Sequence, residues 1–274
     1  MSNSQLQSVA RLCRKRAQRL WYYGVASLLG MAVTAGANPQ GSPPAQQPPA
    51  VAAPLDDPLR LIDNARRSME GIRDYTCLLV KRERLRGELQ PENLVSMKVR
   101  NRPFCVYMRW LRPKQFDGQE VCYMQGKNNG QMRAQSPGIL GLAGFISVDV
   151  DDPRVIANSR HTILEAGIGN LIERMAKAWE QERAWGLTQV SLADYEYNRR
   201  RCTRVETIHP TNPGNRFTSY RTVMYFDKEH HLPIRIEVYD WPRQGGSRDG
   251  ELLEVYSYAD LKLNVGLKDE TFNY

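Results

Sequence analysis

The last fifty residues constrain the fold most, because their side chains alternate as only a β-strand allows. In the segment 232–239 every second side chain is apolar, as at Ile234, Ile236 and Val238. The side chains that follow each of these three are charged or aromatic. A period of two residues is typical of a strand with one buried face. Turn-forming residues bound the segment at 227–231 and at 242–246. We therefore expect Ile234, Ile236 and Val238 to share one face of an antiparallel sheet.

Similar strand patterns recur along most of the chain. We expect strands over 75–85, 94–100, 104–111, 119–125, 131–134, 188–197, 201–209 and 216–226, and two more after residue 232. The total is about ten strands in antiparallel order. The strand at 104–111 is apolar on both faces apart from Arg109, so it is covered on both sides or one face lines a cavity. We read the charged run 81–84 as a cross-strand charge ladder.

Two amphipathic helices interrupt the strands. The first opens with Asp57 as N-cap and Pro58 in the first turn. The second covers about residues 170–183, with Asn170 and Glu173 as a capping box. Each has one apolar stripe that needs a surface to cover. The residues therefore predict an α+β fold in which two helices pack on an antiparallel sheet.

The start of the chain predicts export. Five basic residues precede an apolar run at 21–33 and the small residues Ala35, Gly36 and Ala37. This is the pattern of a signal peptide over 1–37, cleaved near Ala37, and an uncleaved signal anchor is the alternative. A Pro/Ala/Gln-rich stretch at 38–55 predicts a disordered linker, and 56–274 a single folded domain. We expect the domain to be periplasmic or secreted, and at most peripheral to a membrane.

Charge and cysteines narrow the class further. The formal net charge is +8. Removing the five basic residues of the signal peptide leaves 33 basic against 30 acidic residues, a net charge of +3. No nucleic-acid motif is present, so we expect no nucleic-acid partner. Cys77, Cys105, Cys122 and Cys202 remain, and we expect one or two disulfides, with buried free thiols as the alternative.

The sequence contains no recognisable catalytic constellation. Nucleophile-elbow, nucleotide-binding and zinc patterns are absent, so we expect no enzyme activity, no cofactor and no metal. A cleft in which carboxylates or a histidine of shifted pKa converge would revive an enzyme hypothesis. The Gly-rich apolar stretch at 136–146 is either a loop packed on the core or a lid over an apolar pocket.

Several motifs resemble known exported proteins. The C-terminal segments DKEHHLPIRIEVYDW and YSYADLKLNVGLKDETF resemble the LolA/LolB-like superfamily of periplasmic carriers, through Asp227, Leu232, Pro233, Asn264, Leu267 and Phe272. The segment RWLRPKQFDGQEVCYMQG is similar to a hairpin of outer-membrane lipoprotein-sorting relatives, through Leu111, Pro113, Gly118 and Tyr123. A closer resemblance, to a bacterial secreted domain-of-unknown-function family, spans nearly all of the mature chain.

The resemblance implies a strongly curved antiparallel sheet, an unclosed barrel, with helices on its concave face. It further implies a non-enzymatic carrier or binder of lipid or lipoprotein acyl chains. The alternative is a protein-binding sensor or structural module of the cell envelope, similar to RseB-type regulators, with an envelope protein as partner. As lining of an apolar cavity we expect Phe104, Val106, Met108, Trp110, Ile234, Ile236 and Val238.

Overall fold

The structure is a computed structural model and describes residues 54–138, 141 and 144–273. The expected signal peptide and almost the whole linker lie outside these residues, as do residues 139, 140, 142 and 143 of the expected lid. Leu55, which we assigned to the linker, is 2% exposed and packs in the core, so the folded domain includes it. No helix of the described residues is long and apolar enough to cross a membrane.

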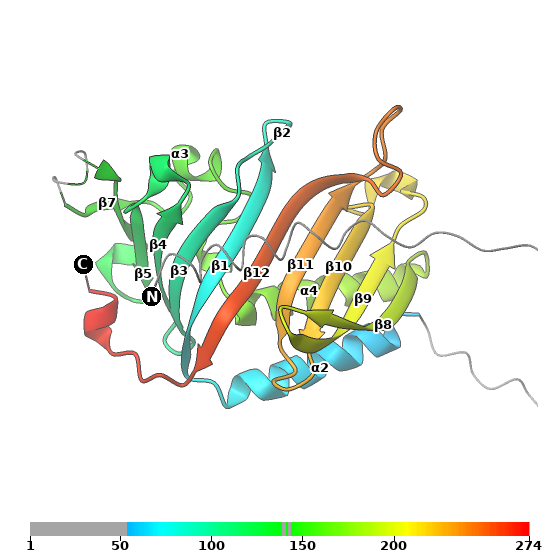
Figure 1. The fold of residues 1–274 in the computed structure, drawn as a ribbon, viewed down its shortest axis with the longest axis horizontal. Helices are drawn as coiled ribbons and strands as arrows, with labels where there is room; N and C mark the ends of the chain where they lie inside the picture. The colour runs from blue at the N-terminus through cyan, green and yellow to red at the C-terminus, as the bar shows by residue number, and fades with distance from the viewer. Residues whose placement is uncertain (1–53, 139–140, 142–143, 274) are drawn as a thin grey trace, which may run out of the picture. The chain divides into compact units, whose positions relative to one another are not determined.

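Twelve strands of the described region form one antiparallel sheet (Figure 1). Its order is β7-β6-β5-β4-β3-β1-β12-β11-β10-β9-β8, and β2 pairs only with β1. The bounds are β1 Asp74–Leu85, β2 Glu88–Leu89, β3 Asn93–Arg100, β4 Cys105–Arg112, β5 Glu120–Met124, β6 Met132–Gln135, β7 Ile146–Val148, β8 Gln189–Tyr197, β9 Arg200–Ile208, β10 Arg221–Asp227, β11 Pro233–Asp240 and β12 Glu251–Leu263. The last strand lies beside the first, so two meanders meet at the β1–β12 pair. The edge strands β7 and β8 do not pair with each other, and the expected unclosed antiparallel sheet is confirmed.

The strand predictions missed only the shortest elements. Strands β2 and β7 have two and three residues, which is too short for a period of two to show in the sequence. The remaining strands correspond to the ten that we expected.

Helices α2 (Asp56–Glu70) and α4 (Ile168–Trp185) lie on the same side of the sheet, behind it in Figure 1, and we call the side they cover the inner face. Helix α2 begins one residue before the predicted cap: Leu55 is the N-cap residue, and no side chain caps the helix. The carboxylates of Asp56 and Asp57 instead lie in the first turn, where the helix dipole favours negative charge.

The capping box predicted for the second helix is wrong. Gly167 is the N-cap residue of α4, and the Asn170 amide donates to the backbone carbonyls of Leu164 and Ala166, both at 2.8 Å. The helix ends at Gly186 in the left-handed conformation (φ 66°), which glycine adopts without steric cost. A third helix, α3 (Pro153–Ile156), has four residues and was not expected.

Strand register aligns apolar side chains across the inner face. One row runs through six neighbouring strands: Cys77, Met97, Met108, Val121, Ala134 and Ile146. Along β1 the inner-facing positions are Tyr75, Cys77, Leu79, Lys81 and Glu83, so the face changes from apolar to charged along a single strand.

A β-bulge in β11 corrects the face that we predicted for Ile234. Tyr225 pairs with Arg235 and Phe226 with Pro233, which leaves Ile234 as the extra residue. Ile236 and Val238 therefore face the inner core, whereas Ile234 packs with Val223 and other residues on the outer face.

The four cysteines of the described region are free and buried, so the expected disulfides are wrong and the alternative holds. Cys77 packs on the inner face, and Cys105 and Cys122 pack with Tyr107 on the outer face. Burial raises the pKa of Cys122 to about 12 and that of Cys202 to about 11, so these thiols stay protonated and act as small apolar groups.

Two of the C-terminal residues that carry the resemblance, Asn264 and Leu267, bind the segment that follows β12 to the connection between α2 and β1. The Asn264 amide accepts a hydrogen bond from the backbone N–H of Arg73 at 2.8 Å and donates to the carbonyl of Gly71 at 3.1 Å. The Asp74 carboxylate accepts from the N–H groups of Gly266 and Leu267. Asn264 and Leu267 therefore have a structural role in the fold.

Candidate functional site

A cavity of about 420 Å³ lies between the inner face and the segment that leads into α4, and we call it the main cavity. Its apolar walls come from the sheet, from the turn before α4 and from α4 itself: Leu79, Met97, Met108, Trp110, Val121, Met132, Ala134, Ile146, Val148, Ile163, Leu171, Ile236 and Tyr258. The volume falls within the range of small-molecule sites. The cavity is therefore large enough to hold a flexible apolar chain.

The seven residues that we expected to line the cavity lie in four different places. Met108, Trp110 and Ile236 line the main cavity. Val106 and Val238 belong to the inner core without lining it, and Ile234 lies on the outer face. Phe104 lines a second cavity, described below.

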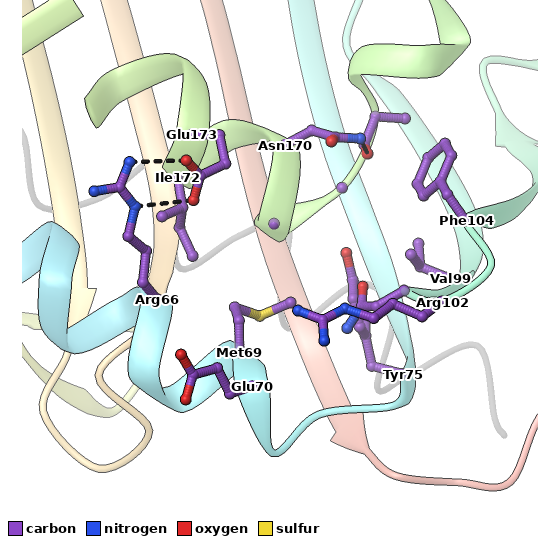
Figure 2. A pocket seen from close by; sticks show the side chains of 14 residues that line it. Arg66, Met69, Glu70, Tyr75, Val99, Arg102, Phe104, Asn170, Ile172 and Glu173 are labelled. Carbon is purple, nitrogen blue, oxygen red and sulfur yellow. Dashed lines mark hydrogen bonds and ion pairs between the residues drawn. The ribbon is translucent and has the colours of Figure 1, made fainter. Parts of the chain in front are cut away.

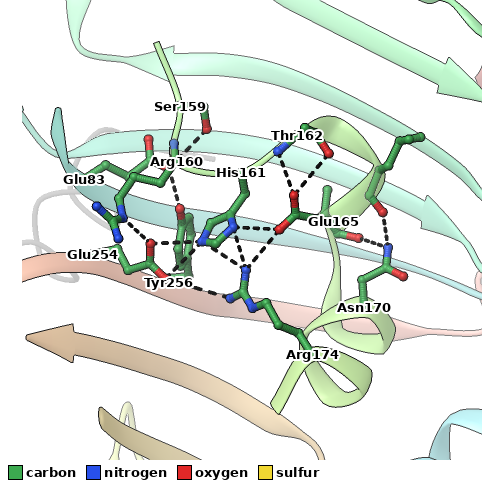
Figure 3. A network of polar contacts seen from close by, with 12 residues as sticks. Glu83, Ser159, Arg160, His161, Thr162, Glu165, Asn170, Arg174, Glu254 and Tyr256 are labelled. Atoms are coloured by element: carbon green, nitrogen blue, oxygen red, sulfur yellow. Dashed lines mark hydrogen bonds and ion pairs between the residues drawn. The ribbon is translucent and has the colours of Figure 1, made fainter. Parts of the chain in front are cut away.

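The far end of the main cavity adjoins two buried carboxylates. Glu83 of β1 and Glu254 of β12 lie directly opposite each other in the register, and each residue is only 4% exposed (Figure 3). Two like charges at such positions repel, so each carboxylate requires its own set of donors and cations.

Donors from three directions surround Glu83. Lys81 lies 3.0 Å away along the same strand, Tyr256 donates its hydroxyl, and Ser159 donates at 3.2 Å. Burial would raise the pKa of Glu83, but the Lys81 charge and these hydrogen bonds lower it below its ordinary value. Burial and both carboxylates raise the pKa of Tyr256, which keeps its hydroxyl protonated as a donor.

Glu254 is held by side chains of residues 158–167, which we call the covering segment, and of α4. Arg160 Nε donates to it at 2.6 Å, His161 Nε2 lies 2.9 Å away, and Arg174 Nη2 lies at 3.9 Å. Burial would raise the pKa of Glu254, but His161, Arg174 and Arg160 together lower it to about 2. Glu254 therefore connects β12 to the covering segment and to α4.

His161 lies between two carboxylates. Its Nδ1 is 2.8 Å from Glu165 and its Nε2 is 2.9 Å from Glu254, while Arg174 Nη1 lies at 2.8 and 3.0 Å from the same two ring nitrogens. Arg174 also lies 3.6 Å from Glu165 and 3.9 Å from Glu254, so the histidine, the arginine and the two carboxylates form one connected network. A capping box with Thr162 fixes Glu165 in place.

This arrangement meets the geometric condition that we set for an enzyme, since a histidine and carboxylates converge at a cleft. No described serine or cysteine, however, is hydrogen-bonded to His161: the Ser159 hydroxyl donates to Glu83 instead. Both ring nitrogens already have partners. In the structure the cluster connects β1, β12, the turn before α4 and α4 itself.

A second cavity, of about 430 Å³, lies between α2, the start of α4 and the turn between β3 and β4 (Figure 2). It is more polar than the main cavity. Arg66 crosses from α2 to Glu173 of α4 with two hydrogen bonds of 2.9 and 2.8 Å, and Phe104 forms part of the opposite wall.

Sequence reasoning missed the charged cluster, although one signal was available. Glu83 follows Tyr75, Cys77 and Leu79 in alternation, so the pattern placed it on the buried face. We instead assigned it to a charge ladder. Arg84 of that run does pair with Glu251 of the neighbouring strand at 3.5 Å, but Glu83 is buried. Nothing in the sequence indicated that His161 and Arg174 would meet there.

One described cluster has the residue types of a metal site: Asp227, Glu229 and His230. The Arg200 guanidinium occupies it, at 2.8 Å from Asp227 and 3.0 Å from Glu229. An arginine in this position supplies the positive charge that a metal ion would supply.

Comparisons with known proteins place the chain in a family. The family model described as "Protein of unknown function (DUF1571)" matches residues 72–274. This agrees with the resemblance to a domain-of-unknown-function family seen in the sequence. No functionally curated protein matches the chain.

Three solved structures are similar in topology. An uncharacterized conserved protein from Thermus thermophilus has a TM-score of 0.46 at 9% identity, covering 80% of this chain and 94% of its own. Lipoprotein LppX of Mycobacterium tuberculosis has a TM-score of 0.44 at 10% sequence identity, and the match covers 78% of this chain and 98% of LppX. A LolA superfamily protein from Nitrosomonas europaea has a TM-score of 0.30 at 11% sequence identity, and the match covers 78% of this chain and 96% of that protein. Likeness at this level transfers neither ligand nor partner.

Proposed function

Because the chain belongs to the DUF1571 family of proteins of unknown function, we propose its role from the main cavity: the exported domain binds an acyl chain of a lipid or lipoprotein. The observation that supports this proposal is the apolar lining, supplied by a continuous row of side chains from five adjacent strands. Met97, Met108 and Met132 suit a flexible ligand, because methionine adapts its shape.

Binding of this kind needs no bond chemistry. Each methylene moved from water into the cavity contributes about 0.8 kcal/mol. About sixteen buried methylenes contribute about 13 kcal/mol, which offsets a loss of ligand freedom of about 5 kcal/mol and leaves roughly micromolar affinity. The segment that covers the cavity, held through Glu254, is the part that would move to admit the chain.

The proposal is tested by filling the cavity. Ala134 lines the main cavity, and a tryptophan there removes space that the chain needs. We expect Ala134→Trp to weaken binding of a fluorescent fatty acid roughly tenfold or more, because overpacking costs about 1–3 kcal/mol. Ala193→Trp on the exposed part of β8 is the matched control and should bind as wild type does.

Mass spectrometry of organic extracts from the purified protein provides the independent readout. Co-purified lipid in the wild-type protein and its loss in Ala134→Trp support the proposal. Equal binding by both tryptophan variants, with circular dichroism showing both folded, would contradict it.

A second candidate is the protein-binding module, favoured by the edge strand β8. Its outer edge has no strand partner among the described residues, and Leu192 and Tyr195 on it are 41% and 48% exposed. An extended peptide can add to such an edge. Ala193→Trp separates the two candidates, because it disturbs this edge and leaves the cavity unchanged.

A further inference from the structure

Tyr258 of β12 carries a buried hydroxyl that has no hydrogen-bond partner among the described residues. Its side chain lines the main cavity, and the residue is 8% exposed. Two other tyrosines of the inner face differ: the Tyr75 hydroxyl accepts from the N–H of Ile168, and the Tyr256 hydroxyl donates to Glu83. Buried polar groups are nearly always hydrogen-bonded, so an unpaired hydroxyl in the wall of a cavity points to a ligand.

The Tyr258 hydroxyl keeps its proton and can donate a hydrogen bond. Burial raises the pKa of Tyr258 well above its ordinary value, and Cys77 raises it further. The charge of Arg174, which lines the same cavity, lowers this pKa but does not offset burial. A ligand that satisfies Tyr258 therefore has to present a hydrogen-bond acceptor.

The charges around the main cavity favour a neutral acceptor. Each lysine and arginine that lines it is paired with a carboxylate within the described region (Figure 3): Lys81 with Glu83, Arg154 with Asp152, and Arg174 with Glu165 and Glu254. A carboxylate ligand would bury its charge without a cation of its own, which is costly. The carbonyl oxygen of an ester or an amide accepts a hydrogen bond and brings no charge.

From Tyr258 the main cavity extends across the sheet to the edge strand β7, past β1, β3, β4, β5 and β6. Six strand spacings of about 4.8 Å give a path of about 29 Å along the sheet. From β3 to β7 the strand residues that line the cavity are all apolar: Met97, Met108, Trp110, Val121, Met132, Ala134, Ile146 and Val148. This part of the wall suits an acyl chain whose carbonyl lies at β12.

We propose that Tyr258 donates a hydrogen bond to an ester or amide carbonyl of the ligand, and that the acyl chain extends from this carbonyl toward β7. The proposal rests on the proposed function, since it requires a chain in the main cavity. It identifies the preferred ligand as an ester-linked or amide-linked acyl chain. A free fatty acid binds through its chain alone and therefore more weakly.

The test measures how four probes displace a fluorescent fatty acid from the full chain. Methyl palmitate and N-methylpalmitamide carry the carbonyl as an ester and as an amide, palmitate carries a carboxylate, and heptadecane is a comparable chain without an acceptor. We expect Tyr258→Phe to weaken the ester and the amide roughly tenfold and to leave heptadecane unchanged, because only the carbonyl loses a donor. The wild-type protein should bind the ester or the amide more tightly than palmitate, and the tighter of the two identifies the linkage.

Tyr239→Phe is the matched control, since Tyr239 packs on the outer face and its hydroxyl donates to Glu237. It should change the binding of none of the four probes. Infrared spectroscopy gives a second readout: the carbonyl stretch of bound, isotope-labelled methyl palmitate should lie at lower wavenumber in the wild-type protein than in Tyr258→Phe. Urea denaturation of ligand-free Tyr258→Phe should show no loss of stability, because the hydroxyl has no partner in the described region.

Equal weakening of methyl palmitate and heptadecane by Tyr258→Phe, or no weakening of the ester and the amide, would overturn the role of Tyr258 and leave the acyl-chain proposal intact. Tighter binding of palmitate than of the ester and the amide would overturn the preference for a neutral carbonyl. Failure of the fluorescent fatty acid and of all four probes to bind the wild-type protein would instead reject the acyl-chain proposal.

Discussion

The middle and the end of the inner face are built by the same strands and differ completely in chemistry. In the middle, Leu79 of β1 lies beside its register partner Tyr258 of β12, and both line the apolar main cavity. Four residues further along β1, Glu83 faces Glu254, and both are as buried as the apolar residues. Strand alternation determines only which face a side chain occupies. The stability of the middle depends on packing, whereas that of the charged end depends on every carboxylate keeping its donors.

The largest expected loss of stability comes from removing a carboxylate at the charged end. Glu254→Ala leaves Arg160, His161 and Arg174 without their common carboxylate, so we expect a loss of about 4 kcal/mol in the free energy of unfolding. Urea denaturation measures the loss. Glu251→Ala, on the same strand but at an ion pair with Arg84 in which Glu251 is 25% exposed, should cost about 1 kcal/mol. Similar losses for both variants would mean that the buried cluster is no more important to stability than a surface pair.

Acid should weaken the charged end selectively. The pKa of Glu254 is about 2 in the folded protein, below the ordinary value of 4.5. Its stabilising contribution is therefore fully present above about pH 4.5 and is lost as the pH falls through about 2. We expect Glu254→Gln to be less stable than wild type by about 2–3 kcal/mol near neutral pH. That difference should shrink steadily below about pH 4.5. A difference that stays constant from neutral pH to about pH 2 would contradict the lowered pKa.

The sequence predicted the elements that bury one continuous face and not the places where the strand register changes. Periodicity identified the long strands and both long helices, because each buries one continuous face. It failed where one residue alters the register. The bulge at Ile234 rotates that side chain to the outer face, and no composition signal marks it. Strand β2 pairs with β1 and strand β7 with β6, and both are too short for a period of two to show in the sequence.

Prediction of the site was partial for a related reason. Met108, Trp110 and Ile236 follow from strand alternation and line the main cavity. The polar residues His161 and Arg174 come from a turn and a helix, 93 and 80 positions before Glu254 and therefore far from it in sequence. Only the fold brings them to Glu254, so local patterns contain no information about the cluster.

On the inner face, the smallest expected loss of stability comes from a substitution between its apolar middle and its charged end. Lys81 lies on this border, since it lines the main cavity and pairs with Glu83 at 3.0 Å. In Lys81→Met the carboxylate loses one cation but keeps Tyr256 and Ser159 as donors. We expect a stability loss of about 2 kcal/mol, measured by urea denaturation, because two donors to Glu83 remain. The apolar region is extended by one side chain, so a fatty-acid probe should bind about two- to threefold more tightly. A loss as large as that of Glu254→Ala would place Lys81 inside the charged cluster, and weaker probe binding would mean that the ammonium group holds the ligand.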